Sequence, residues 1–153
     1  MNRILFQLNL AKMRASFDDP LFDDFKVWLN ALHALAEADP GFLWRYKGED
    51  DHAGHIAPYP CAPLIMGNMS AWRDYDSLYA YTFTDGHLEI MKNKRKWFEP
   101  MQQPYGVLYY GDEDDLVKPK DELLKTALLK LAYLKKHGET SNAFGFGSHR
   151  GIL

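Results

Sequence analysis

The sequence predicts an α+β fold of the ferredoxin-like, split βαβ type with an added C-terminal helix. Three observations support this class. Apolar residues recur with strand-like and helix-like periods in the order strand, helix, strand, strand, helix, strand, helix. The chain has 153 residues, which suits one domain of ordinary size. Proline, glycine and aspartate separate the periodic segments, as expected for turns between elements.

The first half of the chain accounts for two strands and one helix. Residues 4–11 alternate in character with a period of two, which predicts the first strand. Asp19 and Pro20 are typical of a helix start, and the helical spacing that follows ends near 39–41. A short second strand is predicted over 42–46. The polar loop that follows, 47–63, is long for a hairpin, so we expect it to border the entrance of a pocket.

The second half repeats the pattern and adds a helix. Residues 64–72 predict a third strand, and Asp74 can cap a helix that breaks around 84–86 and resumes from His87 to Phe98. A fourth strand is predicted over 105–110. The last helix is expected to open at Pro119 and to end at Gly138. We therefore divide the chain into a domain, 1–138, and a loose or docked C-terminal tail, 139–153.

Apolar residues on both faces of the strands predict self-association. If the helices cover only one face of the sheet, the other face exposes Phe6, Leu8 and Met69 to water. An exposed apolar surface of that size usually marks an association site. Two sheets packed face to face would form a dimeric α/β barrel, so the sequence predicts a homodimer.

The composition and charge of the chain argue against several kinds of binding partner. The formal charge of −3 gives no general attraction to nucleic acid, and no apolar stretch is long enough to span a membrane. Cys61 is the single cysteine, which favours a reducing, cytoplasmic location. Glycine-rich phosphate loops are absent from the sequence, so a nucleotide cofactor is not expected.

His87 is the candidate catalytic residue, because imidazole titrates near neutral pH and can move a proton, bind a ligand or hold a metal. The alternative is a half-buried histidine that is hydrogen-bonded to a backbone carbonyl. Polar strand residues and nearby aromatic residues predict a pocket between the sheet and the helices. The candidate substrate-binding residues are Asn9, Trp44, Asn68, Ser70, Trp72, Tyr81, Met91, Arg95 and Trp97.

Two charged segments have alternative interpretations. Arg95 could bind a carboxylate or phosphate through its planar guanidinium, or it could belong to a solvated basic face. The segment 49–55 contains carboxylates with His52 and His55, which could bind a divalent ion on a loop. A solvated loop is the favoured interpretation, so no dedicated metal site is predicted.

Four segments and His87 together resemble a known family. They read QLNLA at 7–11, DPGFLWR at 39–45, GNMSAW at 67–72 and RKWFEP at 95–100. They are similar to a bacterial and fungal family known as domain of unknown function 3291, in the dimeric α/β-barrel superfamily that includes antibiotic-biosynthesis monooxygenases. The resemblance implies the barrel dimer and a pocket between sheet and helices.

The wider superfamily also includes haem-degrading enzymes. These use an asparagine on the first strand, an aromatic residue on the second helix and a histidine further along it. Asn9, Tyr81 and His87 occupy comparable places here, with a tyrosine in place of the enzymes' tryptophan and a shorter stretch before the histidine.

The leading functional hypothesis is a small-molecule enzyme, monooxygenase-like or of another type, that acts on an apolar or aromatic metabolite. His87 would act as general acid or base. No cofactor is the favoured expectation, and haem is the alternative. Two other classes stay open. One is a protein that binds haem or a hydrophobic ligand without turnover, with His87 as axial ligand, and the other is a structural dimeric module.

Overall fold

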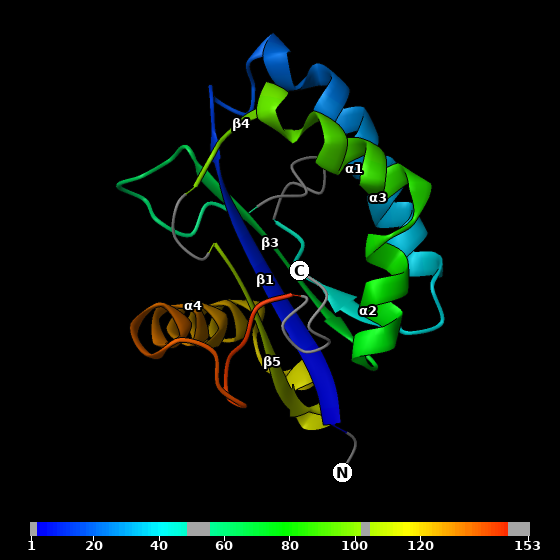
Figure 1. Ribbon diagram of the computed structural model, residues 1–153, viewed down its shortest axis with the longest axis vertical. Coiled ribbons are helices and arrows are strands. Elements are labelled where there is room, and N and C mark those ends of the chain that lie inside the picture. The colour runs from blue at the N-terminus through cyan, green and yellow to red at the C-terminus, as the bar shows by residue number, and fades with distance from the viewer. Residues whose placement is uncertain (1–2, 49–55, 102–104, 147–153) are drawn as a thin grey trace.

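A single antiparallel sheet runs through the middle of the protein, with helices on both faces (Figure 1). The computed structural model describes residues 3–48, 56–101 and 105–146. The strands are β1 (Arg3–Met13), β2 (Phe42–Arg45), β3 (Ile65–Trp72), β4 (Phe98–Glu99) and β5 (Gly106–Asp112). The α-helices are α1 (Asp23–Ala38), α2 (Tyr75–Thr82), α3 (Asp85–Asn93) and α4 (Lys120–His137). Short 3-10 turns occur at Pro20–Phe22, Lys94–Lys96 and Glu113–Val117. The predicted α+β class and element order are confirmed.

The strand order is β2-β3-β1, and the remaining edge of β1 pairs with both β5 and β4. β5 pairs with the first part of β1, from Arg3 to Asn9, and β4 pairs with its end at Lys12 and Met13. This is the arrangement that a split βαβ unit produces. The central strand β1 therefore carries residues to the middle of the sheet, with β3 on one side and β5 on the other.

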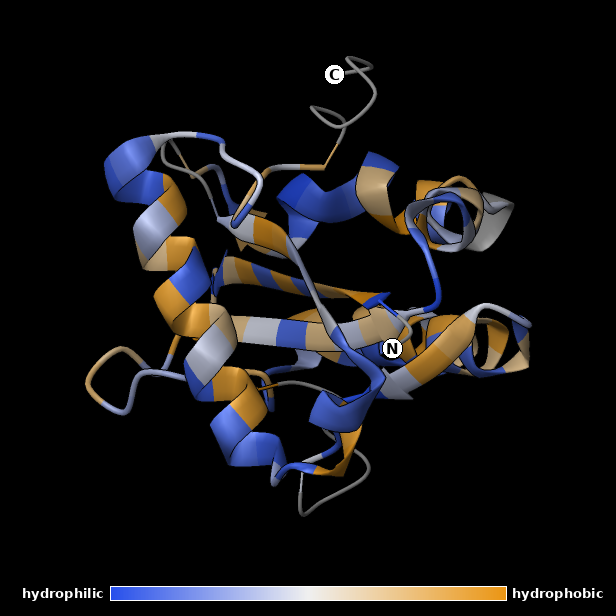
Figure 2. Cartoon of the chain, turned by 90° about the horizontal axis from the view of Figure 1, so that it is seen from below, coloured by the Kyte–Doolittle hydropathy of each residue, from blue (hydrophilic) through white to orange (hydrophobic). Residues whose placement is uncertain are grey.

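Helix α4 covers the sheet face that was expected to be open to solvent. Phe6, Leu8 and Met69 are buried, with exposed fractions of 1%, 0% and 2%. They pack in one cluster with the α4 stripe that contains Ala127 and Leu131. Figure 2 shows the sheet between α4 on one side and the other helices opposite. The prediction that this face is exposed is wrong, because the C-terminal helix of the same chain buries it.

The segment after His87 also differs from the prediction of a helix that continues to Phe98. Helix α3 ends at Asn93, a 3-10 turn follows, and Phe98 lies in strand β4 opposite Met13. The end of β1 holds this segment, because the Arg14 amide donates to the Trp97 carbonyl at 2.9 Å. The break predicted around 84–86 is confirmed, since α2 ends at Thr82 and α3 begins at Asp85.

The described part of the C-terminal tail is docked. Phe144 and Leu108 exchange backbone hydrogen bonds of 2.8 and 3.0 Å, so the tail continues the sheet along the outer edge of β5. The Phe146 ring stacks on Tyr75 and Tyr79, with centroids 5.7 and 6.0 Å apart. Within the described residues, no helix is both long enough and apolar enough to cross a bilayer.

Candidate functional site

A polar network lies on the sheet face that α1, α2 and α3 cover. The Gln7 side-chain amide donates to Asn68 Oδ1 at 3.0 Å and to Ser70 Oγ at 2.8 Å. The Trp72 indole donates to the same Ser70 oxygen at 2.8 Å. Because Ser70 Oγ accepts two hydrogen bonds, its own proton is left for a further acceptor. A buried hydroxyl of this kind can orient an oxygen atom of a ligand.

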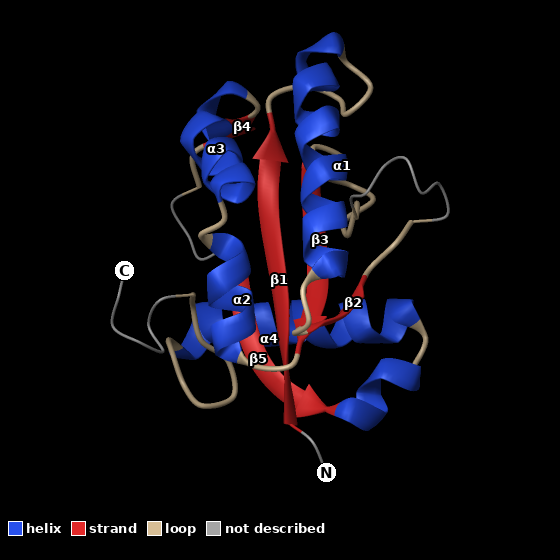
Figure 3. Ribbon diagram, turned by 90° about the vertical axis from the view of Figure 1, so that its right-hand side faces the viewer, coloured by secondary structure: helices blue, strands red, loops and turns tan. Residues whose placement is uncertain are grey.

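Solvent reaches the middle of this face. Asn9 and Asn68 are directly opposite each other on the two central strands, yet both are exposed. Figure 3 looks onto this face and shows β1 between α1 and the α2–α3 pair. Asn9 lies against Gly106 of β5, where a side chain would collide with its amide oxygen. The two exposed amides therefore form a polar floor on a sheet face that helices flank on both sides.

Apolar clusters flank this polar floor on both sides. One cluster joins Leu5, Trp72 and Leu78. The other joins Met13, Phe25 and Trp97. The result is a floor of amide and hydroxyl groups between aromatic walls, which is the composition typical of small-molecule sites.

Three rings in succession connect the sheet to α3. Tyr81 stacks on Trp72 with centroids 5.0 Å apart and a 30° interplanar angle. His87 contacts Tyr81 edge-on at 5.4 Å and 65°. Burial raises the pKa of Tyr81 to about 12, although the nearby Arg45 charge acts in the opposite direction. Tyr81 therefore stays protonated at neutral pH, and its hydroxyl donates to the Leu32 carbonyl of α1 at 3.4 Å.

His87 is half-buried, and its Nδ1 atom is buried without a hydrogen bond in the part of the chain that the structure describes. Burial lowers the pKa of His87, and the Thr82 carbonyl partly opposes this shift. The imidazole is therefore neutral at pH 7, with one nitrogen able to accept a proton. Half-burial and a hydrogen bond to the Thr82 backbone are also what the alternative interpretation of His87 predicts, whereas the buried Nδ1 atom without a partner costs stability.

Arg45 is a member of this region that sequence analysis did not include. It lies opposite Ser70 in the β2–β3 register, and its Nε donates to Glu37 of α1 at 2.8 Å. That hydrogen bond is the main reason why the pKa of Glu37 is lowered. Strand alternation could have placed Arg45 beside Ser70, but the irregular register between Phe42 and Trp44 hides the pairing. Gln7 was also left out, although its alternation with Asn9 puts both on this face.

The structure brings together six of the predicted residues, namely Asn9, Asn68, Ser70, Trp72, Tyr81 and His87. Trp97 is buried in the second apolar cluster, and its indole nitrogen has no hydrogen bond among the described residues. Trp44 packs on the α4 face of the sheet. Met91 is 43% exposed, and Arg95 is also exposed. Trp44 therefore lies on the opposite face of the sheet from Ser70 and Trp72.

The loop that was considered for metal binding, with His52 and His55, lies outside the described residues. Within the described ranges, no group of three or more histidine, cysteine, aspartate or glutamate side chains is placed to hold a metal ion.

The fold and the position of the polar face define an α+β protein of the ferredoxin-like type with a candidate site between sheet and helices. Residues 4–151 match the family described as Domain of unknown function (DUF3291), and the chain belongs to that family. No curated protein sequence matches the chain.

Solved structures share the fold at low sequence identity. Protein SO0527 from Shewanella oneidensis has a TM-score of 0.53 and 7% identity, over 72% of this chain and 93% of that one. A putative antibiotic biosynthesis monooxygenase from Nitrosomonas europaea has a TM-score of 0.48 and 18% identity, over 73% and 92%. SnoaB from Streptomyces nogalater, a cofactor-independent oxygenase, has a TM-score of 0.48 and 11% identity, over 78% and 100%.

Proposed function

We propose that the protein is a small-molecule enzyme, monooxygenase-like in its chemistry, that acts on an apolar or aromatic metabolite bound between the sheet and helices α1–α3. The observation that carries this proposal is the buried His87 Nδ1 atom without a hydrogen bond among the described residues, on an imidazole that contacts Tyr81, which in turn stacks on Trp72 of the sheet. A neutral imidazole in such a place suits general base catalysis.

Each group has a distinct role in the proposed reaction. The Trp72 and Tyr81 rings supply a flat apolar wall, and the amides of Asn9 and Asn68 orient polar atoms of the substrate. The Ser70 proton donates to a substrate oxygen. His87 accepts a proton from an acidic O–H or C–H group. Deprotonation makes an aromatic substrate such as a phenol electron-rich enough to reduce dioxygen. One oxygen atom becomes a new carbonyl of the resulting quinone, the other leaves as water with two substrate hydrogens, and the substrate supplies all four electrons.

Haem does not fit the arrangement that the resemblance suggests. Tyr81 is in ring contact with both Trp72 and His87, so its ring takes up the space between the imidazole and the sheet. A macrocycle bound by His87 at this position would have to displace Tyr81. The proposed reaction therefore uses no haem.

We also propose a cytoplasmic homodimer. The sheet face around Phe6 is covered by α4, so the contact must use another surface. Val27 and Leu35 on α1 are apolar, with exposed fractions of 70% and 47%, and could contribute to it. Cys61 is exposed as a free thiol, which suits a reducing compartment.

Native mass spectrometry of the purified protein tests the ligand and the assembly in one measurement. We expect a mass of two chains, with an added small apolar or aromatic molecule that is lost in a Ser70→Ala variant, since this change removes the hydroxyl without adding volume. A Cys61→Ser variant is the control and should keep the ligand.

The outcomes separate the hypotheses. A ligand recovered chemically unchanged after aerobic incubation would favour a binding protein over an enzyme. Masses of one chain at micromolar concentration would contradict the proposed dimer. A ligand retained equally by Ser70→Ala would place the binding site elsewhere.

A further inference from the structure

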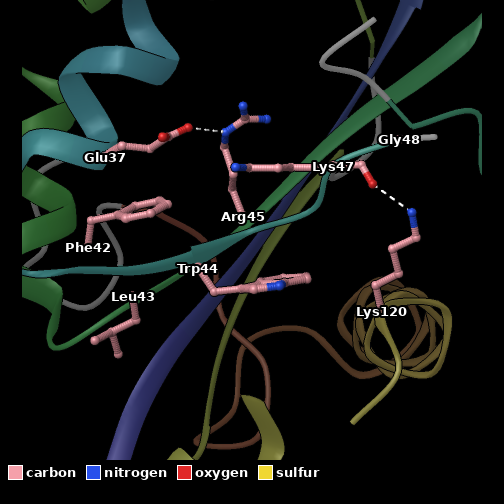
Figure 4. A pocket seen from close by; sticks show the side chains of 8 residues that line it. All are labelled: Glu37, Phe42, Leu43, Trp44, Arg45, Lys47, Gly48 and Lys120. Atoms are coloured by element: carbon pink, nitrogen blue, oxygen red, sulfur yellow. Dashed lines mark hydrogen bonds and ion pairs between the residues drawn. The ribbon is translucent and has the colours of Figure 1, made fainter. Parts of the chain in front are cut away.

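A separate open cavity of about 720 Å³ follows the outer edge of β2, between α1 and α4 (Figure 4). Cavities that bind small molecules commonly have volumes of roughly 300–1,000 Å³. Trp44 lines this cavity and packs on the α4 face of the sheet, opposite the face that carries Ser70 and Trp72. His87 does not line the cavity, although Arg45, which lies opposite Ser70, borders both regions.

The cavity is cationic in a chain whose formal charge is −3. Three of its lining side chains are basic and one is acidic, which leaves two positive charges in excess: Arg45, Lys47, Lys120 and Glu37. Glu37 accepts from Arg45 Nε at 2.8 Å, and the charge of Lys47 also contributes to the lowered pKa of Glu37. Arg45 is thus ion-paired with Glu37, and Lys47 lies near enough for its charge to act on the same carboxylate.

The other end of the cavity is aromatic. Trp44 is half-buried and meets the Tyr46 ring edge-on at 6.4 Å. Lys120 lies 5.0 Å from the centre of the Tyr46 ring and donates to the Lys47 carbonyl at 2.7 Å. These contacts fix Lys120 beside the cavity. In Figure 4 the Trp44 indole lies on one side of β2, and the Arg45 and Lys47 side chains lie on the other.

We propose that this cavity is a second binding site, for a small planar aromatic carboxylate. The carboxylate lies beside Lys47 and Arg45, where the excess positive charge attracts it. The ring lies against Trp44, because aromatic pairs gain stabilisation beyond the area that they bury. The ligand therefore straddles the edge of β2 and contacts both α1 and α4.

The test uses 2-naphthoate as the probe and the ¹H–¹⁵N NMR signals of the tryptophan indoles as the readout. A Trp44→Phe variant assigns the Trp44 signal by its disappearance. We expect 2-naphthoate to move that signal with a Kd on the order of 1 mM or tighter. Because the uncharged analogue 2-naphthalenemethanol lacks the carboxylate, it should bind at least about threefold more weakly.

Charge reversals supply the matched comparison. Lys47→Glu and Lys120→Glu should each weaken 2-naphthoate binding about fivefold or more, since each replaces an attraction with a repulsion. Lys125→Glu makes the same change on an exposed position of α4 outside the cavity, so it should alter Kd less than about twofold.

The proposal is overturned if the Trp44 signal does not move, if the alcohol binds as well as the acid, or if Lys125→Glu weakens binding as much as Lys47→Glu. A His87→Ala variant should bind the probe normally, which separates this site from the proposed enzyme site.

Discussion

Replacing His87 by alanine is expected to lower the turnover of the natural substrate by about a hundredfold or more, because general base catalysis contributes at least this much in most enzymes. The imidazole lies against Tyr81, and Nδ1 is buried with no hydrogen bond among the described residues, so a substrate reaches it only when the neighbouring side chains move. The measurement is kcat/KM for the molecule identified by native mass spectrometry. His137→Ala is the control, since His137 is exposed at the end of α4.

The pH profile adds a second readout that a structural role would not affect. His87 acts in its neutral form, and burial lowers its pKa from the ordinary 6.5. Activity should therefore stay high at pH 6.5 and fall only as the pH drops through the lowered pKa. A His87→Gln variant should lose both the activity and this acidic limb. Unchanged kcat/KM in both variants would reject the catalytic role.

Replacing Leu131 by alanine is expected to lower the free energy of unfolding by roughly 2 to 5 kcal/mol. Leu131 is 1% exposed and lies in the cluster that joins α4 to Phe6, Leu8 and Met69. Truncation leaves a cavity where the helix meets the sheet. The check is urea unfolding followed by circular dichroism.

Leu129→Ala is the matched control for this prediction. Leu129 is on the same helix but is 64% exposed, so the same truncation should change the free energy of unfolding by less than about 0.5 kcal/mol. Equal effects of the two substitutions would mean that α4 does not cover this sheet face in solution. The face around Phe6 would then be available for a sheet-to-sheet dimer.

Local sequence patterns were sufficient to predict most of the helices and strands. The alternation of β1, the capping aspartate before α2 and the C-terminal Gly138 of α4 all predicted their elements within a few residues. The end of α3 was not predictable in this way. It depends on pairing between Met13 and Phe98, and that contact joins positions far apart in the sequence.

It was harder to predict which helices cover which face of the sheet than to predict the helices and strands themselves. The apolar stripe of α4 was visible in the sequence, but a stripe does not tell which sheet face it covers when both faces are apolar. The candidate site shows the same limit. Strand alternation grouped Asn9, Asn68 and Ser70 correctly, whereas Trp44 and Arg45 required the β2–β3 register to decide which side each one occupies.

The most direct test of the central claim is an NMR titration of the His87 imidazole nitrogens, with and without the ligand. The site that we propose predicts a pKa below 6.5 for His87 in the free protein, and an Nδ1 signal that moves when the ligand binds. A pKa at or above 6.5 would contradict it. So would an Nδ1 signal that stays in place while the ligand shifts the side-chain amides of Asn9 and Asn68.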